Sequence, residues 1–307
     1  MEGGDAPAGA AQMISCLRRR RSDPERPTLE RNRVPALPAL SIAERLTFMA
    51  GCLPRTPFRD LVEAAAQAGF DSMTLWPNVW RHALGKEGLT LADMRAMLEH
   101  NGLVLTDVDS YGGWTPGAAP KVPVEEFFEV CTALGGSTLI AVHGGGALDV
   151  HRETEGFARL CDQAATHGLR VALEFVGFSP LCDVASAWKI VTGADRPNGG
   201  ITLDVAHHMR STRDDAALRA VDPAKAYTVQ LCDGPDRAPA DLSDEARYHR
   251  ALPGTGDFNV RGFVRTLAAM GVRASVGPEL YQSSFQSRPP LDVMRELMSA
   301  TRKVLEV

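Results

Sequence analysis

Residues 200–211, which read GITLDVAHHMRS, place a carboxylate and an imidazole three positions apart in Asp204 and His207. The segment begins with apolar residues, including Ile201 and Leu203, that belong inside a folded domain. A carboxylate that is buried there without a partner costs several kcal/mol. The sequence therefore requires something that compensates Asp204, and an arginine, a backbone cap and a metal ion are the candidates.

Three further apolar segments also contain oxygen-bearing side chains near their ends, namely Glu174 in VALEF, Gln230 in VQLCDG and Glu279 in VGPEL. If Glu174, Asp204 and Glu279 share one site, their charges repel strongly unless a carboxyl is protonated or a divalent cation lies between them. Carboxylate and amide oxygens with one imidazole suit Mn²⁺, Mg²⁺ or Co²⁺ better than a closed zinc site, which recruits cysteines or several histidines. We therefore expect one divalent metal ion, with Mn²⁺ as the first choice and Zn²⁺ still open.

The elements that position these residues repeat along the chain. FRDLVEAAAQAGFDSMTLW and VRGFVRTLAAMGVRASVGPEL share one pattern, in which a helical periodicity is followed by a glycine and a short β-rich apolar run. Strands that are apolar on both faces and alternate with helices form parallel sheets, which predicts the α/β class. Eight strand candidates over roughly 260 residues indicate a single (β/α)8 barrel, the TIM barrel, spanning residues 45–305. The candidates are centred near residues 48, 74, 106, 140, 173, 203, 230 and 277.

In such a barrel the working residues lie at the carboxyl ends of the strands and in the loops that follow. His143 is either a substrate contact or a hydrogen-bonded structural histidine, and Trp76 either covers a pocket or only packs. His208 is expected to point away from His207 because side chains alternate along a strand. Asp233 is expected to orient a ligand or Arg250. The strand-end rule selects Trp76, Asp107, Asp109, His143, Glu174, Asp204, His207, His208, Gln230, Asp233 and Glu279.

The order of these motifs resembles a known family. Glu in VALEF, Asp-x-x-His in LDVAHH, a polar residue in VQLCDG and Glu in VGPEL, with RALPGTGDF between the last two strands, are similar to the xylose isomerase-like sugar phosphate isomerase/epimerase superfamily. The resemblance covers about residues 45–305 and is to the branch with ketose 3-epimerases, hydroxypyruvate isomerase, inosose dehydratase and 3-dehydroshikimate dehydratase. Many epimerases of the branch have His in place of Gln230, whereas some of its dehydratases carry Gln. The resemblance implies that the metal ligands are Glu174, Asp204, Gln230 and Glu279 and that His207 and Arg250 bind the substrate.

The resemblance further implies an enzyme that acts on a sugar or polyol-like hydroxy-carbonyl compound. Glu174 and Glu279 would act as base and acid, and the cation would stabilise the enediolate formed between the two proton transfers. Return of the proton makes an isomerase or epimerase, which is our first expectation, whereas loss of a β-hydroxyl makes a dehydratase of a cyclic keto-polyol such as 3-dehydroshikimate or an inosose. A metal-free barrel that binds a ligand without catalysis is the alternative outside enzymes. The small-molecule partner, a sugar, polyol or keto acid, would be contacted by His207, Arg250, His143 and Trp76.

Composition limits the other functions. The chain has 33 Lys and Arg against 38 Asp and Glu, a formal net charge of -5, and its first forty residues hold seven arginines and five acidic residues. The remainder is therefore acidic and lacks the basic footprint of the DNA endonucleases with this type of barrel. No apolar run approaches the length of a membrane span, no secretory signal is evident, and the six cysteines form no C-x-x-C pair. We expect a cytoplasmic protein with a Pro/Arg-rich flexible, disordered tail over residues 1–40, without membrane or nucleic-acid partners, and with homo-oligomerisation left open.

Overall fold

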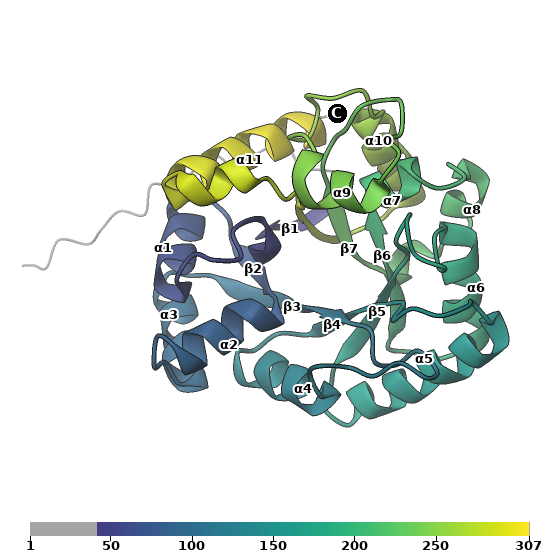
Figure 1. Cartoon of the computed structure of the whole chain (residues 1–307), viewed down its shortest axis with the longest axis horizontal. Helices are drawn as coiled ribbons and strands as arrows, with labels where there is room; N and C mark the ends of the chain where they lie inside the picture. The colour runs from purple at the N-terminus through teal and green to yellow at the C-terminus, as the bar shows by residue number, and fades with distance from the viewer. Residues whose placement is uncertain (1–41, 307) are drawn as a thin grey trace, which may run out of the picture. The chain divides into compact units, whose positions relative to one another are not determined.

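The computed structural model describes residues 42–306, so the tail predicted over residues 1–40 lies outside the described part of the chain. Eight parallel strands close into a barrel in which each strand pairs with its neighbours in the sequence and β1 pairs with β8 (Figure 1). This confirms the predicted (β/α)8 barrel. The strands are β1 (Ala43–Phe48), β2 (Ser72–Leu75), β3 (Val104–Tyr111), β4 (Thr138–Val142), β5 (Arg170–Glu174), β6 (Gly199–Asp204), β7 (Ala226–Leu231) and β8 (Ala274–Pro278).

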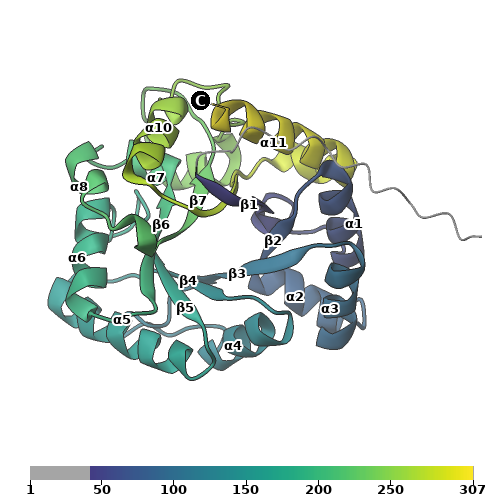
Figure 2. The same cartoon turned by 180° about the vertical axis from the view of Figure 1, so that it is seen from behind.

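Helices alternate with the strands and form a layer outside the barrel, which is visible from both sides (Figure 1, Figure 2). The glycine pattern correctly predicts where helices end, because α1 stops at Gly69 with φ 93° and α10 stops at Gly271 with φ 84°, a left-handed conformation that glycine adopts readily. Among the described helices, none is long and apolar enough to cross a membrane. The main helices are α1 (Phe58–Ala68), α2 (Pro77–Gly85), α3 (Leu91–His100), α4 (Val124–Ala133), α5 (Val150–Ala165), α6 (Val184–Ala194), α8 (Asp215–Arg219), α10 (Val260–Met270) and α11 (Pro290–Leu305).

The register of the strands places predicted site residues side by side. Gln230 of β7 is paired with Asp204 of β6 and with Gly277 of β8. Glu174, the last residue of β5, is paired with Thr202 of β6. Because all strands run in the same direction, their carboxyl ends gather at one end of the barrel, where the side chains can form one site.

Strand β6 ends at Asp204, although the apolar pattern predicts that it continues to residue 208. Asp204 is the N-cap of a short helix, α7 (Val205–Met209), and its Oδ1 accepts a hydrogen bond from the backbone N–H of His207 at 3.0 Å. The alternation argument for His208 is therefore wrong, because this residue is helical. Its ring packs against Phe263 of α10, and its Nε2 lies 3.1 Å from Oδ1 of Asp215.

The interior of the barrel holds a buried carboxyl group, Asp107 of β3, which is 1% exposed. The hydroxyl of Thr228 donates to its Oδ1 at 3.1 Å, whereas Oδ2 has no hydrogen-bond partner among the described residues. Burial raises the pKa of Asp107 to about 6, because desolvation disfavours the charged form. An ionised Asp107 at neutral pH therefore reduces the stability of the fold.

Asp107→Asn should stabilise the protein increasingly as the pH rises. The pKa of Asp107 in the folded state, about 6, lies above the ~3.9 of an unfolded chain. The native protein therefore loses stability as the pH rises between these two values, and its stability loses nothing more to Asp107 at higher pH. Urea unfolding between about pH 4 and 7 should show the advantage of the variant growing by on the order of 1–3 kcal/mol, with most of the growth below about pH 6. Asp162→Asn on α5, where the carboxylate is 55% exposed, is the control and should show no such growth. A difference between Asp107→Asn and the native protein that stays constant over this range would contradict the assignment.

Candidate active site

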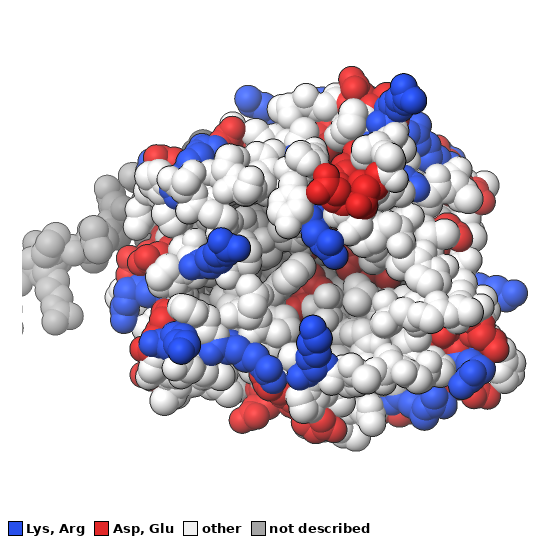
Figure 3. All heavy atoms as spheres, in the orientation of Figure 1, with Lys and Arg blue, Asp and Glu red and all other residues white. Residues whose placement is uncertain are grey.

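A cavity of about 760 Å³ opens at the carboxyl ends of the strands. Figure 3 shows this hollowed face, with acidic side chains at the base of the hollow. Asp204 and Gln230 do not line the cavity and are buried beside it, at 1% and 0% exposure. The structure thus brings the predicted residues together, while their chemical roles stay predictions. The predicted residues that line the cavity are Trp76, His143, Glu174, His207, Arg250 and Glu279, joined by Asp109 and Tyr281.

Asp204 is compensated by both a backbone cap and an arginine. Besides the cap at its Oδ1, its Oδ2 accepts a hydrogen bond from Nη1 of Arg250 at 3.1 Å. Burial raises the pKa of Asp204, but the charge of Arg250 and the contacts with His207 outweigh that effect and hold the pKa below its usual value. Two of the three candidate compensations are therefore present in the protein chain itself, and Asp204 stays ionised.

The other carboxyl groups of the cavity have less compensation. Burial, followed by the charge of Asp204, raises the pKa of Glu279 to about 7, although Tyr281 donates its hydroxyl to Oε1 of Glu279 at 3.1 Å. Burial and the charge of Glu279 also raise the pKa of Glu174 and of Asp109 well above their usual values. One guanidinium, Arg250, thus faces four carboxyl groups, which leaves room for additional positive charge.

His207 stands between the carboxylates, with Nε2 3.7 Å from Oε1 of Glu174 and 3.9 Å from Oδ2 of Asp204. Ligand atoms of these three side chains all lie within 4.8 Å of one another, a spacing that could hold a metal ion. However, the backbone N–H of Gly177 donates to Nδ1 of His207 at 3.2 Å. Burial lowers the pKa of His207 to about 4, so the ring is neutral. Its Nε2 lies 3.3 Å from Nη2 of Arg250, and a guanidinium can only donate. Each ring nitrogen of His207 thus faces an N–H donor of the protein, although a neutral imidazole has only one acceptor nitrogen.

Gln230 is fully buried, yet neither its Oε1 nor its Nε2 has a hydrogen-bond partner among the described residues. Buried amides in folded proteins almost always have partners. The strand register places Gln230 beside Asp204. An unpartnered amide oxygen next to a carboxylate is what a cation site with oxygen ligands requires, so Gln230 fits the predicted metal site.

Trp76 and His143 contribute to the wall of the cavity in different ways. Trp76 packs edge-on against Tyr281, with ring centroids 5.4 Å apart. His143 accepts the backbone N–H of Gly145 at Nδ1, at 3.2 Å, and its Nε2 lies 3.4 Å from Oε1 of Glu153. Both nitrogens of His143 therefore have partners within the protein, which leaves the ring face and edge for contact with a ligand.

The strand-end rule omits several parts of the cavity wall, of which two matter most for the chemistry. Tyr281 lies two residues beyond Glu279, and this position was the signal that could have identified it. The other is residues 246–248, which belong to a π-helix (Glu245–His249) in the long connection between β7 and α10. No periodicity in the sequence predicts that segment.

The same connection positions Arg250. Asp233 accepts backbone hydrogen bonds from Gly234 and Phe258 at Oδ1, at 2.8 and 2.9 Å, and from Gly254 at Oδ2, at 3.0 Å. Its backbone pairs with Ala251, the residue after Arg250. Asp233 therefore organises the backbone of the loop that carries Arg250, and no hydrogen bond joins the side chains of these two residues in the described part of the chain.

A buried ion pair secures the π-helix. Arg210, at the end of α7, donates its Nε–H to Oε2 of Glu245 at 2.6 Å and a second N–H to Oε1 at 2.5 Å. The two side chains are only 4% and 6% exposed. The helix that contains His207 and the segment that precedes Arg250 are thus held together.

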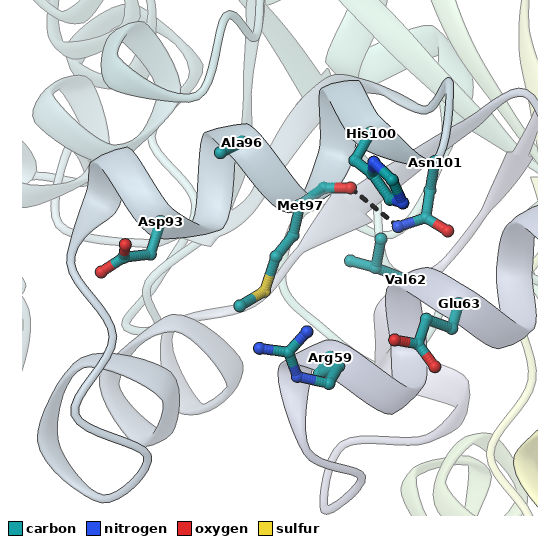
Figure 4. A pocket seen from close by; sticks show the side chains of 8 residues that line it. All are labelled: Arg59, Val62, Glu63, Asp93, Ala96, Met97, His100 and Asn101. Atoms are coloured by element: carbon teal, nitrogen blue, oxygen red, sulfur yellow. Dashed lines mark hydrogen bonds between the residues drawn. The ribbon is translucent and has the colours of Figure 1, made fainter.

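A second hollow lies on the outer helix layer, between α1 and α3 (Figure 4). Its volume is about 330 Å³, and its walls include Arg59 and Glu63 of α1 and Met97 of α3. Asn101 donates its amide N–H to the backbone oxygen of Met97 at 2.9 Å. None of the predicted site residues lines this hollow, so the chemistry of the protein is expected elsewhere.

Residues 62–304 match the family model described as xylose isomerase-like TIM barrel. This chain belongs to that family. Membership in the xylose isomerase-like TIM barrel family confirms the resemblance that the motifs indicate, and the match covers the carboxyl ends of β2 to β8.

Curated relatives of this xylose isomerase-like barrel include two kinds of enzyme. This chain is 26% identical over 272 residues to 3-dehydroshikimate dehydratase of Pseudomonas aeruginosa. The aligned region covers 84% of this chain and 41% of that protein. The chain thus spans about two fifths of the length of this relative. This chain is also 28% identical over 196 residues to inosose isomerase of Bacillus licheniformis. That aligned region covers 59% of this chain and 68% of that protein.

Solved structures show the same xylose isomerase-like fold. A crystal structure of IOLI protein with a bound zinc atom has a TM-score of 0.74 at 19% identity and covers 85% of this chain and 98% of that chain. L-ribulose 3-epimerase has a TM-score of 0.67 at 15% identity and covers 85% of this chain and 94% of that chain. At these identities the likeness shows the shared fold alone.

Glu245→Gln should destabilise the protein strongly, because it leaves the buried guanidinium of Arg210 without its counter-charge. Loss of one partner of a buried ion pair costs about 3–5 kcal/mol. The control is Asp162→Asn, which removes an ion pair with Arg196 whose side chains are 37% and 55% exposed, and should cost less than about 1 kcal/mol. Free energies of unfolding from urea titrations measure both. Equal costs for the two variants would show that the Arg210 pair does not fix the connection.

Proposed function

We propose that this protein is a divalent-metal-dependent enzyme that removes a proton next to the carbonyl group of a small hydroxy-carbonyl compound. The observation that carries the proposal is the buried amide of Gln230, which lies beside the ionised Asp204 and has no partner among the described residues. Such an amide reduces stability unless it binds something that the protein chain does not supply. A cation ligated by the amide oxygen supplies that partner.

The ligands proposed for this ion are all oxygens. Oxygen ligands favour Mn²⁺ or Mg²⁺ over Zn²⁺, and we propose Mn²⁺. The related IOLI protein binds zinc, so the preference for Mn²⁺ rests on the donor atoms of this chain. When bound, the cation would polarise the substrate carbonyl and stabilise negative charge on its oxygen. The proposed ligands are Glu174, Asp204, Gln230 and Glu279.

Glu174 and Glu279 are placed to move the proton. Both line the cavity, and burial raises the pKa of each, that of Glu279 to about 7. Enzymes use buried carboxyl groups with raised pKa values to move protons between carbon and a side chain. Neutral His207 would contact a substrate oxygen from the cavity wall, and Arg250 holds Asp204 in its ionised form. Trp76 and His143 would contact the substrate from the wall.

Of the two reaction classes that this chemistry allows, we propose dehydration. The matches to 3-dehydroshikimate dehydratases cover 84% and 78% of the chain, and the match to inosose isomerase of B. licheniformis covers 59%. Gln230, in place of the histidine of many epimerases, favours the same class. The second candidate is the isomerase or epimerase expected first from the sequence, and it is supported by the match that covers 68% of inosose isomerase.

Product mass after reaction in D₂O separates the two candidates. The protein is incubated with Mn²⁺ and with 3-dehydroshikimate or an inosose, and the products are analysed by mass spectrometry. A dehydratase yields a product lighter by one water, whereas an isomerase retains the mass apart from incorporated deuterium. Glu174→Gln is the control that should abolish either change, and persistent turnover in that variant would show that Glu174 does not take part in the proton transfer.

Gln230→His should change which metal the protein prefers. An amide oxygen carries no proton to lose, whereas an imidazole is softer and competes with the metal for a proton near its unperturbed pKa of about 6.5. Metal competition titrations between about pH 5 and 8 should therefore show a shift toward Zn²⁺ or Co²⁺ and a loss of metal near pH ~6.5 in the variant only.

Gln163→His on the exposed side of α5 adds the same imidazole away from the cavity and is the matched control. It should retain the metal preference and the pH profile of the native protein. If Gln230→His behaves like Gln163→His, then Gln230 does not touch the ion.

A further inference from the structure

The mouth of the cavity has large apolar side chains on its walls. Phe178, in the connection after β5, is 44% exposed, and Tyr248, in the π-helix, is 51% exposed. Val104, Phe178 and Tyr248 are the large hydrophobic residues that are exposed in the described part of the chain. Phe178 and Tyr248 both line the cavity. Phe178 lies edge-on to His207, with ring centroids 5.8 Å apart. Exposed aromatic residues that gather at one opening indicate a surface that covers a ligand.

The cavity wall also carries a cation that has no partner. Its two arginines are Arg247 and Arg250. Arg250 is committed to Oδ2 of Asp204, at 3.1 Å, and to the backbone oxygen of Glu279, at 3.2 Å. Arg247 is exposed and forms no ion pair or hydrogen bond with any residue that the structure describes. Its charge is therefore available to a ligand.

The backbone that presents Arg247 and Tyr248 is held in place. Both residues belong to the π-helix that the buried Arg210 and Glu245 pair secures, and Arg210 also donates to the backbone oxygen of Pro235 at 2.6 Å. Single π-helical turns are rare and occur often at functional sites. An unpaired cation on a fixed backbone can select the position of an anionic group.

We propose that Arg247 binds a carboxylate of the substrate and is a specificity-determining residue of this site. The inference rests on the proposed function and narrows the substrate class to cyclic hydroxy-ketones that carry a carboxylate. The acidic base of the cavity repels an anion, so the carboxylate lies at the mouth on Arg247 and the hydroxy-ketone end lies toward Glu174 and Glu279. The ring lies between Phe178 and Tyr248.

A carboxylate fits this site better than a phosphate. One guanidinium fork pairs with the two oxygens of a carboxylate. A phosphate dianion calls for more donors, and among the described residues the cavity wall has no second unpaired arginine or lysine. A volume of about 760 Å³ is within the usual range for a pocket that encloses a small ligand.

Binding of matched probes tests the inference. The probes are quinate, a cyclic polyol with a carboxylate, its neutral amide quinamide, and inositol 1-phosphate, each titrated calorimetrically with the metal-loaded protein. Native protein should bind quinate more tightly than quinamide or inositol 1-phosphate. Arg247→Gln should weaken quinate about 10-fold or more, as expected for the loss of a charge-assisted hydrogen bond, and leave quinamide unchanged. Arg247→Lys, which retains the charge, should restore part of the affinity.

The control is Arg237→Gln, which removes the same charge from an exposed position of the same connection that does not line the cavity. It should leave all three affinities unchanged. Equal losses for quinate and quinamide in Arg247→Gln, equal losses in Arg237→Gln, or no binding of quinate to the native protein would each overturn the inference. Tighter, Arg247-dependent binding of inositol 1-phosphate would overturn the carboxylate assignment.

The outcomes remain separate from those of the proposed function. Arg247-dependent quinate binding by a protein that binds no divalent ion would contradict the metal-dependent enzyme while supporting the carboxylate site. Metal-dependent turnover together with quinate binding that does not depend on Arg247 would support the metal-dependent enzyme and contradict the carboxylate site.

Discussion

The constraint on which this structure depends is the burial of four carboxyl groups at one end of a barrel that supplies one buried guanidinium to them. Two unit charges about 4 Å apart interact by about 4 kcal/mol at an effective dielectric constant of ~20. Arg250 and the N-terminus of α7 stabilise the charge of Asp204, and the hydroxyl of Tyr281 reaches Glu279. Burial, followed by the charge of Glu279, raises the pKa of Glu174 and of Asp109, and neither group has an ion pair with an arginine or lysine among the described residues. Such a cluster reduces the stability of the protein. We propose that a divalent cation binds among these carboxyl groups during function, which would also explain why Gln230 has no partner among the described residues.

The side chains of the site come from two sources, the strands of the barrel and the long connection after β7. Parallel strands deliver Glu174, Asp204, Gln230 and Glu279 to one rim, because their carboxyl ends meet there. The connection after β7 delivers Arg250, and it is itself held by the carboxylate of Asp233 and by the Arg210 and Glu245 ion pair. The same connection carries Arg247 and Tyr248 to the mouth. The groups proposed for chemistry thus lie on the rigid sheet, and those proposed for specificity lie on a segment that can differ without disturbing it.

The sequence predicts the barrel and most of the cavity because both follow from short-range patterns. Apolar runs of strand length locate the eight strands, and a strand-end rule then selects Glu174, His207 and Glu279. The end of β6 at Asp204 is missed because an apolar continuation, Val205 and Ala206, hides a helix that the Asp204 side chain caps. The ion pair between Arg250 and Asp204 joins residues 46 positions apart, and the π-helix has no periodicity of its own. Such contacts depend on the path of a long connection, which hydrophobic periodicity does not encode.

The most direct test of the central claim is anomalous diffraction from crystals of the protein grown with Mn²⁺, measured at the manganese absorption edge. The account predicts one anomalous peak at the carboxyl ends of β5 to β8, within coordination distance of Glu174, Asp204, Gln230 and Glu279. An ion that lies elsewhere, or no peak at this position in crystals saturated with Mn²⁺, would contradict it.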